Sequence, residues 1–207
     1  VHAGDGRLVA EFATQHRVYV PSEELPDQLI EAFISAEDKE FFEHSGINLW
    51  GIFRGTVINA VQGKRMTGGS TITQQVVKNM LVGSERSLAR KVREAVLAMR
   101  SEKQLTKEEI LELYMNEIYL GGRSYGVGAA ALNYFGKSLS QLTLSEAALM
   151  AGLPQAPGRA NPYSNPEAAV ERRDYVLGRM LANGYIETAA ADAAIAEPLT
   201  LVKRLDT

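Results

Sequence analysis

The chain has 207 residues, of which 45% are hydrophobic and 23% charged, so it can bury a core and is predicted to form one globular domain over residues 1–207. It contains no cysteine, which excludes a disulfide framework and a thiolate metal site. It also lacks a signal peptide and an apolar run of about 20 residues, so we expect any membrane anchor to lie outside this sequence.

The charge is distributed unevenly. Between Lys64 and Lys107 there are ten basic residues and three acidic ones, an excess of seven positive charges in a chain whose net charge is −3. The remainder therefore carries an excess of ten negative charges. A basic segment in an acidic chain indicates a site for an anionic partner such as a phosphate, a lipid headgroup or a nucleic acid, or else a pair of solvated helix faces.

Cap and turn signals divide the chain into short helices. Extended stretches are predicted over about residues 8–12 and 17–20, and helices over about 26–44, 48–62, 71–83, 87–105, 107–119, 144–152, 166–182 and 187–196. Three of the helix starts carry capping boxes, at Thr71, Thr106 and Thr143. The fold class is therefore mainly α, and the absence of a repeat favours an irregular globule over a four-helix bundle.

Glu37 lies within the apolar stripe of the first predicted helix. Phe33, Ile34 and Phe41 precede or follow it by four, three and four residues, so all four side chains share one face. A carboxylate among apolar neighbours loses hydration of its charged form, which raises its pKa toward the range useful to a general base or acid. The alternative is a glutamate at the edge of the stripe that reaches solvent or a basic partner.

The same helix carries the pattern Glu-Asp-x-x-Phe-x-x-His-x-Gly, from Glu37 to Gly46. Asp38 points about 100 degrees away from Glu37 on a helix, so the two are not expected to share a proton. His44 falls in the predicted last turn, where a histidine interacts favourably with the helix dipole and can bond the terminal carbonyls.

The segment from Gly68 to Gln75 suits an anion. Its glycine pair allows close backbone approach, Ser70 and Thr71 supply hydroxyls, and the helix that follows presents free N–H groups. Lys78 lies on the same helix face as Thr71. The pattern is compatible with a phosphate or pyrophosphate and is not a Walker A loop; the alternative is a turn with a helix cap.

Arg90 and Lys91 are spaced to pair with Glu94 on the next helix. Glu94 lies well away from the apolar stripe of that helix, which comprises Leu88, Val92, Ala95, Val96 and Met99. From spacing alone we therefore expect a solvated ion pair rather than a catalytic group.

Four motifs in order resemble those of the peptidoglycan glycosyltransferases (glycosyltransferase family 51), which occur alone or as the N-terminal domain of class A penicillin-binding proteins. They are Glu37-Asp38-x-x-Phe41-x-x-His44-x-Gly46, Gly68 to Gln75 with Lys78-Asn79, Arg90-Lys91-x-x-Glu94, and Lys107-x-x-Ile110-Leu111-Glu112-x-Tyr114-x-Asn116. The resemblance covers nearly the whole chain and implies a lysozyme-like, two-lobed helical fold with a central groove.

The resemblance also implies a reaction and its residues. Lipid II, a disaccharide on undecaprenyl pyrophosphate, would be polymerised into β-1,4-linked glycan strands with inversion. The residue matching Glu37 is the general base, and the one matching Glu94 lies by the donor pyrophosphate, where Mg²⁺ or Mn²⁺ would bind if a metal is used. No organic cofactor is expected. The positions implied to bind or support the substrates are Asp38, Phe41, His44, Ser70, Thr71, Gln75, Lys78, Asn79 and Arg90, whereas Tyr114 and Asn116 are interpreted as structural.

The implied partners are lipid II, the growing strand, a cell-wall synthesis complex and the outer face of the bacterial cytoplasmic membrane, and no nucleic acid. The predicted helix with Leu49, Trp50 and Phe53 belongs either to a lobe immersed in the bilayer or to the core. Two rival functions stay open: a lysozyme-like glycan-cleaving enzyme, which needs no pyrophosphate site, and a non-catalytic helical binding module, which leaves Glu37 without a purpose.

Overall fold

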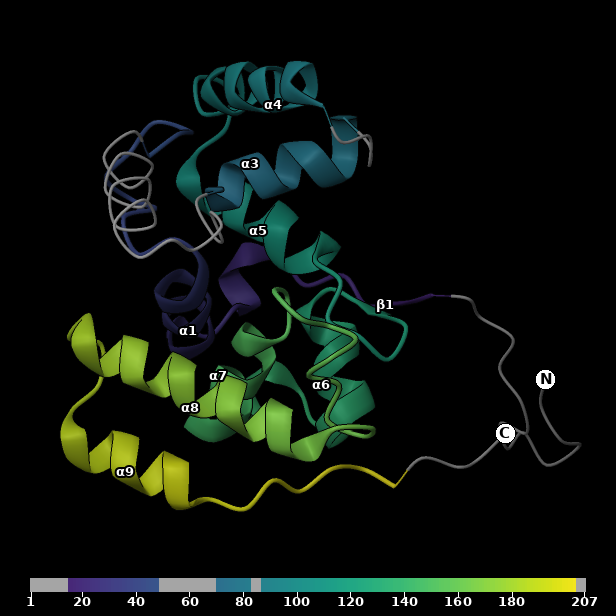
Figure 1. Cartoon of the computed structure of the whole chain (residues 1–207), viewed down its shortest axis with the longest axis vertical. Helices are drawn as coiled ribbons and strands as arrows, with labels where there is room; N and C mark the ends of the chain where they lie inside the picture. The colour runs from purple at the N-terminus through teal and green to yellow at the C-terminus, as the bar shows by residue number, and fades with distance from the viewer. Residues whose placement is uncertain (1–14, 49–69, 83–86, 204–207) are drawn as a thin grey trace, which may run out of the picture.

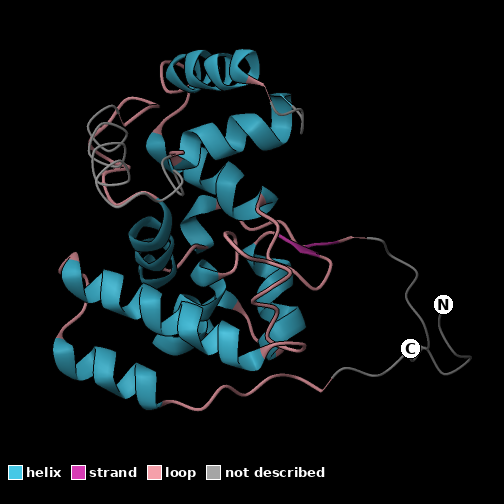
Figure 2. Ribbon diagram, viewed as in Figure 1, coloured by secondary structure: helices cyan, strands magenta, loops and turns pink. Residues whose placement is uncertain are grey.

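The computed structural model describes residues 15–48, 70–82 and 87–203, and helices dominate these ranges (Figures 1 and 2). The mainly α prediction is confirmed. The α-helices are α1 (Asp27–Glu37), α3 (Ile72–Val77), α4 (Leu88–Ser101), α5 (Lys107–Glu117), α6 (Val127–Phe135), α7 (Leu144–Gly152), α8 (Pro166–Ala182) and α9 (Thr188–Ala196). Two short 3-10 turns, η1 (Ser22–Glu24) and η3 (Leu139–Gln141), and a π-helix, η2 (Lys78–Val82), accompany them.

The helices form two groups. Figure 1 shows α3 and α4 at one end of the molecule and α6, α7, α8 and α9 at the other, with α1 and α5 between them. α1 packs against α7 and α8, while α3 packs against α4 and α5. Two-residue strands, β1 (His16–Arg17) and β2 (Ser124–Tyr125), pair in parallel with His16 opposite Ser124.

The first helix ends earlier than predicted, at Glu37 rather than near His44. Asp38 leaves the helix with φ −158° and ψ 74°, because its carboxylate accepts hydrogen bonds from His44 and from the backbone N–H of Ile72. Residues 39–46 form turns that fold back on these partners. Phe41 is nevertheless fully buried, since the turn returns it to the core that the apolar stripe was predicted to fill.

Helix α6 was not predicted, because its flanking glycines were interpreted as loop punctuation. Most of its residues are buried, including Ala130, Ala131 and Tyr134, so it has no polar face to reveal a helical period. The predicted helix over about 48–62 and the extended stretch over 8–12 lie almost wholly outside the described residues. No helix in the described ranges has the length and apolar character needed to cross a membrane.

Candidate active site

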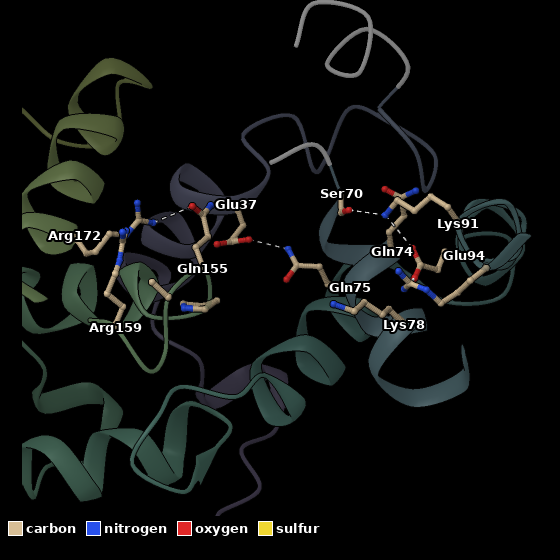
Figure 3. Close-up of a pocket in the computed structure, with 13 residues that line it drawn as sticks. Glu37, Ser70, Gln74, Gln75, Lys78, Lys91, Glu94, Gln155, Arg159 and Arg172 are labelled. Carbon is tan, nitrogen blue, oxygen red and sulfur yellow. Dashed lines mark hydrogen bonds and ion pairs between the residues drawn. The ribbon is translucent and has the colours of Figure 1, made fainter. Parts of the chain in front are cut away.

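A pocket of about 520 Å³ opens between the two groups of helices (Figure 3). One side is formed by the end of α1, the loop after α7 and the start of α8, and the opposite side by α3, η2 and α4. The lining residues are Glu37, Ser70, Gln74, Gln75, Lys78, Arg90, Lys91, Glu94, Pro154, Gln155, Ala156, Arg159 and Arg172. Six of the predicted site residues therefore meet in one pocket although they come from three separate motifs.

A hydrogen bond from the opposite side of the pocket holds the Glu37 side chain in place. Gln75 donates its side-chain N–H to Oε2 of Glu37 at 2.8 Å, while Oε1 is shielded from solvent and has no hydrogen-bond partner among the described residues. Burial raises the pKa of the Glu37 carboxyl, an effect opposed by Gln75, Gln155 and Arg172 and reinforced by the charge of Asp38. The predicted direction of the pKa shift is thus confirmed, and the unpaired Oε1 is an atom able to accept a proton from a ligand.

Asp38, Phe41 and His44 lie behind the pocket rather than in its lining. A hydrogen bond of 2.9 Å joins Nε2 of His44 to the Asp38 carboxylate, and the two side chains are only 8% and 4% exposed. The prediction that His44 lies in the last turn of a helix is wrong, because α1 ends at Glu37 and the His44 ring is hydrogen-bonded to Asp38 instead of to terminal carbonyls. Lys107 donates to the backbone carbonyl of His44 and places its ammonium 4.4 Å from the Phe41 ring centre. This cluster fixes the chain that leaves Glu37.

The Gly68 to Gln75 segment is described only from Ser70 onward. Ser70 lines the pocket, but the Thr71 hydroxyl is occupied elsewhere: it accepts from the Gln74 N–H as the cap of α3 and donates to the carbonyl of Gly46 at 2.7 Å. Lys78 reaches the pocket from the first turn of the π-helix η2, whereas Asn79 is exposed and outside the lining. Thr71 therefore positions α3, and Ser70 and Lys78 face the ligand space.

Glu94 contradicts the expectation of a solvated ion pair. Its side chain is 0% exposed; Arg90 pairs with Oε1, and Lys91 pairs with Oε2 at 2.9 Å. Lys91 also donates to the Ser70 hydroxyl at 2.7 Å. α4 turns this charged face inward and its apolar stripe outward, with Leu88 87% exposed and Val92 64% exposed. Helical periodicity defines two faces but cannot tell which of them faces the protein.

The same contacts bear on the divalent metal considered for Glu94. Both carboxylate oxygens are already paired with cations, which a resident Mg²⁺ or Mn²⁺ would have to displace. Within the described ranges, no three His, Asp or Glu side chains are placed to hold a metal ion together. Hard divalent cations bind through several oxygen ligands, so these residues do not fit a resident metal, and Glu94 instead orders two cations at the pocket wall.

The sequence analysis gave no role to Gln155, Arg159 and Arg172, and it placed Lys91 in a solvated ion pair rather than in the site, although all four line the pocket. Arg172 donates from Nη2 to Oε1 of Gln155 at 3.2 Å and from Nε to the carbonyl of Gly152 at 3.1 Å. Gln155 lies in the Pro154–Pro157 loop and Arg172 in a regular helix, so neither residue has a sequence neighbour that would indicate a site. Only the packing of α8 against α7 brings these groups to Glu37.

A carboxylate of raised pKa that faces Lys78, Arg90 and Lys91 across one pocket defines an enzyme site for proton transfer beside an anionic group. The model of the transglycosylase family matches residues 5–181, and the chain belongs to this family. Penicillin-binding protein 1A of Rickettsia felis is 48% identical over 207 residues, which are 99% of this chain and 26% of that protein. Penicillin-binding protein 1A of Escherichia coli strain K12 is 47% identical over 199 residues, 96% of this chain and 23% of that protein.

The fold agrees with this family. The crystal structure of penicillin-binding protein 1A from Haemophilus influenzae matches with a TM-score of 0.62 and 35% identity, covering 98% of this chain and 20% of that one. The resemblance inferred from the four ordered motifs is therefore confirmed, together with the glycosyltransferase class of enzyme. The chain spans about a quarter of the length of these curated relatives.

Proposed function

We propose that this chain polymerises lipid II into β-1,4-linked glycan strands, with Glu37 as the general base. One observation carries the proposal: Glu37 keeps an oxygen without a hydrogen-bond partner among the described residues, and Lys78, Arg90 and Lys91 line the opposite wall of the same pocket. A base needs a proton acceptor that no internal donor occupies, and a pyrophosphate leaving group needs positive charge within reach.

In the proposed reaction, Oε1 of Glu37 accepts the proton of the acceptor sugar's 4-hydroxyl. The oxygen of that hydroxyl attacks the anomeric carbon of the donor. The bond from that carbon to the pyrophosphate oxygen breaks, and the electron pair leaves with the lipid pyrophosphate. Attack opposite to the leaving group inverts the configuration. Lys78, Arg90 and Lys91 oppose the negative charge that grows on the departing group, while Gln75 keeps Oε2 engaged.

Buried Glu94 serves this reaction by ordering cations. A flexible lysine or arginine loses conformational entropy when it binds an anion. Arg90 and Lys91 are already ordered by their bonds to Glu94, so they lose less entropy when the pyrophosphate binds. Because Glu94 has no free oxygen, we propose that any Mg²⁺ or Mn²⁺ enters with the pyrophosphate. Polymerisation that survives EDTA would agree with this, whereas metal bound tightly without substrate would contradict it.

The two rivals explain less of the pocket. A glycan hydrolase needs a carboxylate but has no use for three cations opposite it, since its leaving group is a sugar hydroxyl. A binding module would account for the cations but not for an ionisable group held at a raised pKa.

The test is polymerisation of lipid II in detergent by the chain and by the Glu37→Gln variant. The amide matches the carboxylate in shape but cannot accept the proton, so chain growth should fall by at least about a thousandfold. Retained helical circular dichroism shows that the fold is intact. Glycan polymer made by the folded variant at a comparable rate would exclude Glu37 as the base.

We also propose that the outer face of α4 lies on the surface of an anionic membrane. Besides Leu88 and Val92, this face exposes Val96 and Met99, and the neighbouring π-helix exposes Leu81. Over residues 88–102 the exposed charges are basic, because the two acidic side chains of this range, Glu94 and Glu102, are only 0% and 6% exposed. An apolar stripe flanked by cations is typical of a helix that lies in a bilayer interface, where a lipid-linked substrate would be reached.

Vesicle flotation tests the membrane proposal. The double change Leu88→Ser and Val92→Ser removes exposed apolar surface and should weaken binding to phosphatidylglycerol vesicles by about tenfold or more, with no loss of thermal stability. Leu132→Ser, which changes an equally apolar exposed residue on α6, is the matched control and should leave binding unchanged. Equal binding by all three proteins would exclude α4 as the contact.

A further inference from the structure

Two glutamine amides flank Glu37 in the pocket, and they are supported differently. On one side Gln75 donates to Oε2. On the other, Gln155 lies beside the carboxylate in Figure 3, and its amide lowers the pKa of Glu37. Gln155 is exposed and stands in a loop, so neither burial nor a helix fixes which end of its amide faces Glu37.

Arg172 supplies that orientation. Its Nη2 donates to Oε1 of Gln155 at 3.2 Å, and an arginine can only donate, so the carbonyl end of the amide is held on the arginine side. The NH₂ end is then left for Glu37. Arg172 is itself fixed by its bond to the Gly152 carbonyl and by the Tyr175 ring, whose centre lies 4.8 Å from the guanidinium carbon.

Gly152 allows this arrangement. A Cβ placed on Gly152 would lie 3.1–3.2 Å from the Cβ, carbonyl carbon and carbonyl oxygen of Arg172, closer than most real contacts. Helices α7 and α8 can therefore approach this closely only because Gly152 has no side chain. The approach brings the guanidinium of Arg172 to the loop that carries Gln155.

We propose that Arg172 is a positioning residue that acts through Gln155 on the catalytic carboxylate Glu37. The inference rests on the proposed function of Glu37 as general base. It adds a relay, from Arg172 to Gln155 to Glu37, that is separate from the cations facing the leaving group. The relay holds the base ready to accept a proton.

Other charged and titratable groups also face Glu37. Asp38 adjoins it in the chain, Tyr114 approaches from α5, and Lys78, Arg90, Lys91, Glu94 and Arg159 line the same pocket. Burial raises the pKa of Tyr114 well above its usual value, so this residue stays neutral. Arg159 carries the same charge as Arg172 but is not among the groups that shift the pKa of Glu37.

The experiment compares the pH dependence of kcat/KM for lipid II polymerisation in Arg172→Ala, Gln155→Ala, the double variant and Arg159→Ala. Loss of the relay raises the pKa of Glu37, so less of the base is ionised at the acid end. We expect each single relay variant to lose about tenfold there and to recover as the pH rises. Arg172 also attracts the Glu37 carboxylate directly, so Arg172→Ala should lose somewhat more than Gln155→Ala. Because the rest of its effect passes through the amide, the double variant should lose no more than Arg172→Ala.

Arg159→Ala is the charge-matched control, and it should lower the rate without moving the acid limb of the pH profile. A shift with Arg159→Ala as large as with Arg172→Ala would overturn the relay in favour of general electrostatics. So would an unmoved limb in Gln155→Ala, a folded variant of an exposed residue. Carbon-13 NMR titration of the Glu37 carboxyl measures the same shift without substrate, so the relay can be judged even if wild-type protein makes no polymer.

Discussion

At the residue scale, the burial that suits Glu37 to its proposed role as a base also lowers the stability of the fold. Burial raises the pKa of its carboxyl in the folded chain, so the ionised form is less favourable in the fold than in the unfolded chain. A raised carboxyl pKa opposes folding at pH values above the unfolded pKa, and this opposition disappears as the pH falls below it. Above the usual pKa of glutamate, the buried Glu37 carboxylate therefore lowers the free energy of unfolding.

Glu37→Gln should consequently be more stable than wild type near neutral pH. The gain should shrink and vanish below the usual pKa of glutamate, about 4.3, where both side chains are neutral. Thermal unfolding of both proteins over this pH range measures the difference. A gain that stays constant as the pH falls would show that the ionised carboxylate is not its source.

A second prediction concerns Lys78, whose exposed ammonium lines the pocket. Lys78→Ala should raise the KM for lipid II by roughly tenfold, since a charge-assisted contact to a phosphate is lost. The dependence of KM on salt should weaken as well, because one screened attraction is removed. Lys103→Ala removes an exposed cation of the same basic segment outside the pocket and should change neither quantity.

The sequence predicted those residues whose chemistry follows from local spacing. Glu37 was placed correctly because the three-and-four rule needs only neighbours on its own helix. The partners of His44 and Thr71 were not predictable, because His44 meets Asp38 in a turn and the Thr71 hydroxyl meets a carbonyl 25 positions earlier. Gln155 and Arg172 were missed for the same reason, since only tertiary packing brings them to Glu37.

At the element scale, helix caps formed where the sequence indicated. Thr71, Thr106 and Thr143 each accept from the N–H three residues on, and each donates its own backbone N–H to the side chain of that residue, which completes a capping box. These signals are local, so they survived folding unchanged. Local signals did not reveal which face of α4 points inward. That orientation depends on tertiary contacts, such as the bond from Lys91 to the Ser70 hydroxyl.

This contrast gives a prediction for α3. Thr71→Ala and Thr143→Ala each remove one cap and should each cost about 1 kcal/mol in the free energy of unfolding. Each also loses a second bond, because the Thr71 hydroxyl donates to the Gly46 carbonyl and the Thr143 hydroxyl donates to Oε1 of Glu197, so the two variants should lose similar stability. Only Thr71→Ala should reduce polymerisation strongly, because α3 and η2 carry Gln75 and Lys78 into the pocket. Denaturant unfolding and the polymerisation rate measure the two effects, and equal loss of activity in both variants would refute a positioning role for this cap.

At the scale of the whole molecule, the pocket exists because two groups of helices are held at a fixed distance. The residues that follow α1 make this connection. Asp38 accepts from the N–H of Ile72 at 3.0 Å, Lys107 donates to the carbonyl of His44, and Gly46 accepts from Thr71. The Glu-Asp-x-x-Phe-x-x-His-x-Gly motif thus supplies the proposed base in its first residue and the connection between the two groups of helices in the others.

Gly46 is the closest point of this connection. Its φ is +88°, and a Cβ built on it would lie 2.7 Å from the backbone of Ala98 and Met99 in α4. Gly184 has a similar φ, +78°, but an added Cβ there meets nothing within 4 Å. The two glycines therefore share the conformational strain that a side chain would introduce and differ only in the clash between the two groups of helices.

Gly184→Ala should cost only the strain of a left-handed alanine, about 1–2 kcal/mol, and should keep full activity. Gly46→Ala should cost clearly more, because α4 must move away from the turn. That movement carries Arg90, Lys91 and Glu94 away from Glu37, so polymerisation should fall even at temperatures where the variant stays folded. Denaturant unfolding combined with activity at low temperature separates the two effects. If the two alanine variants were equally stable and equally active, the turn after α1 would not be what sets the width of the pocket.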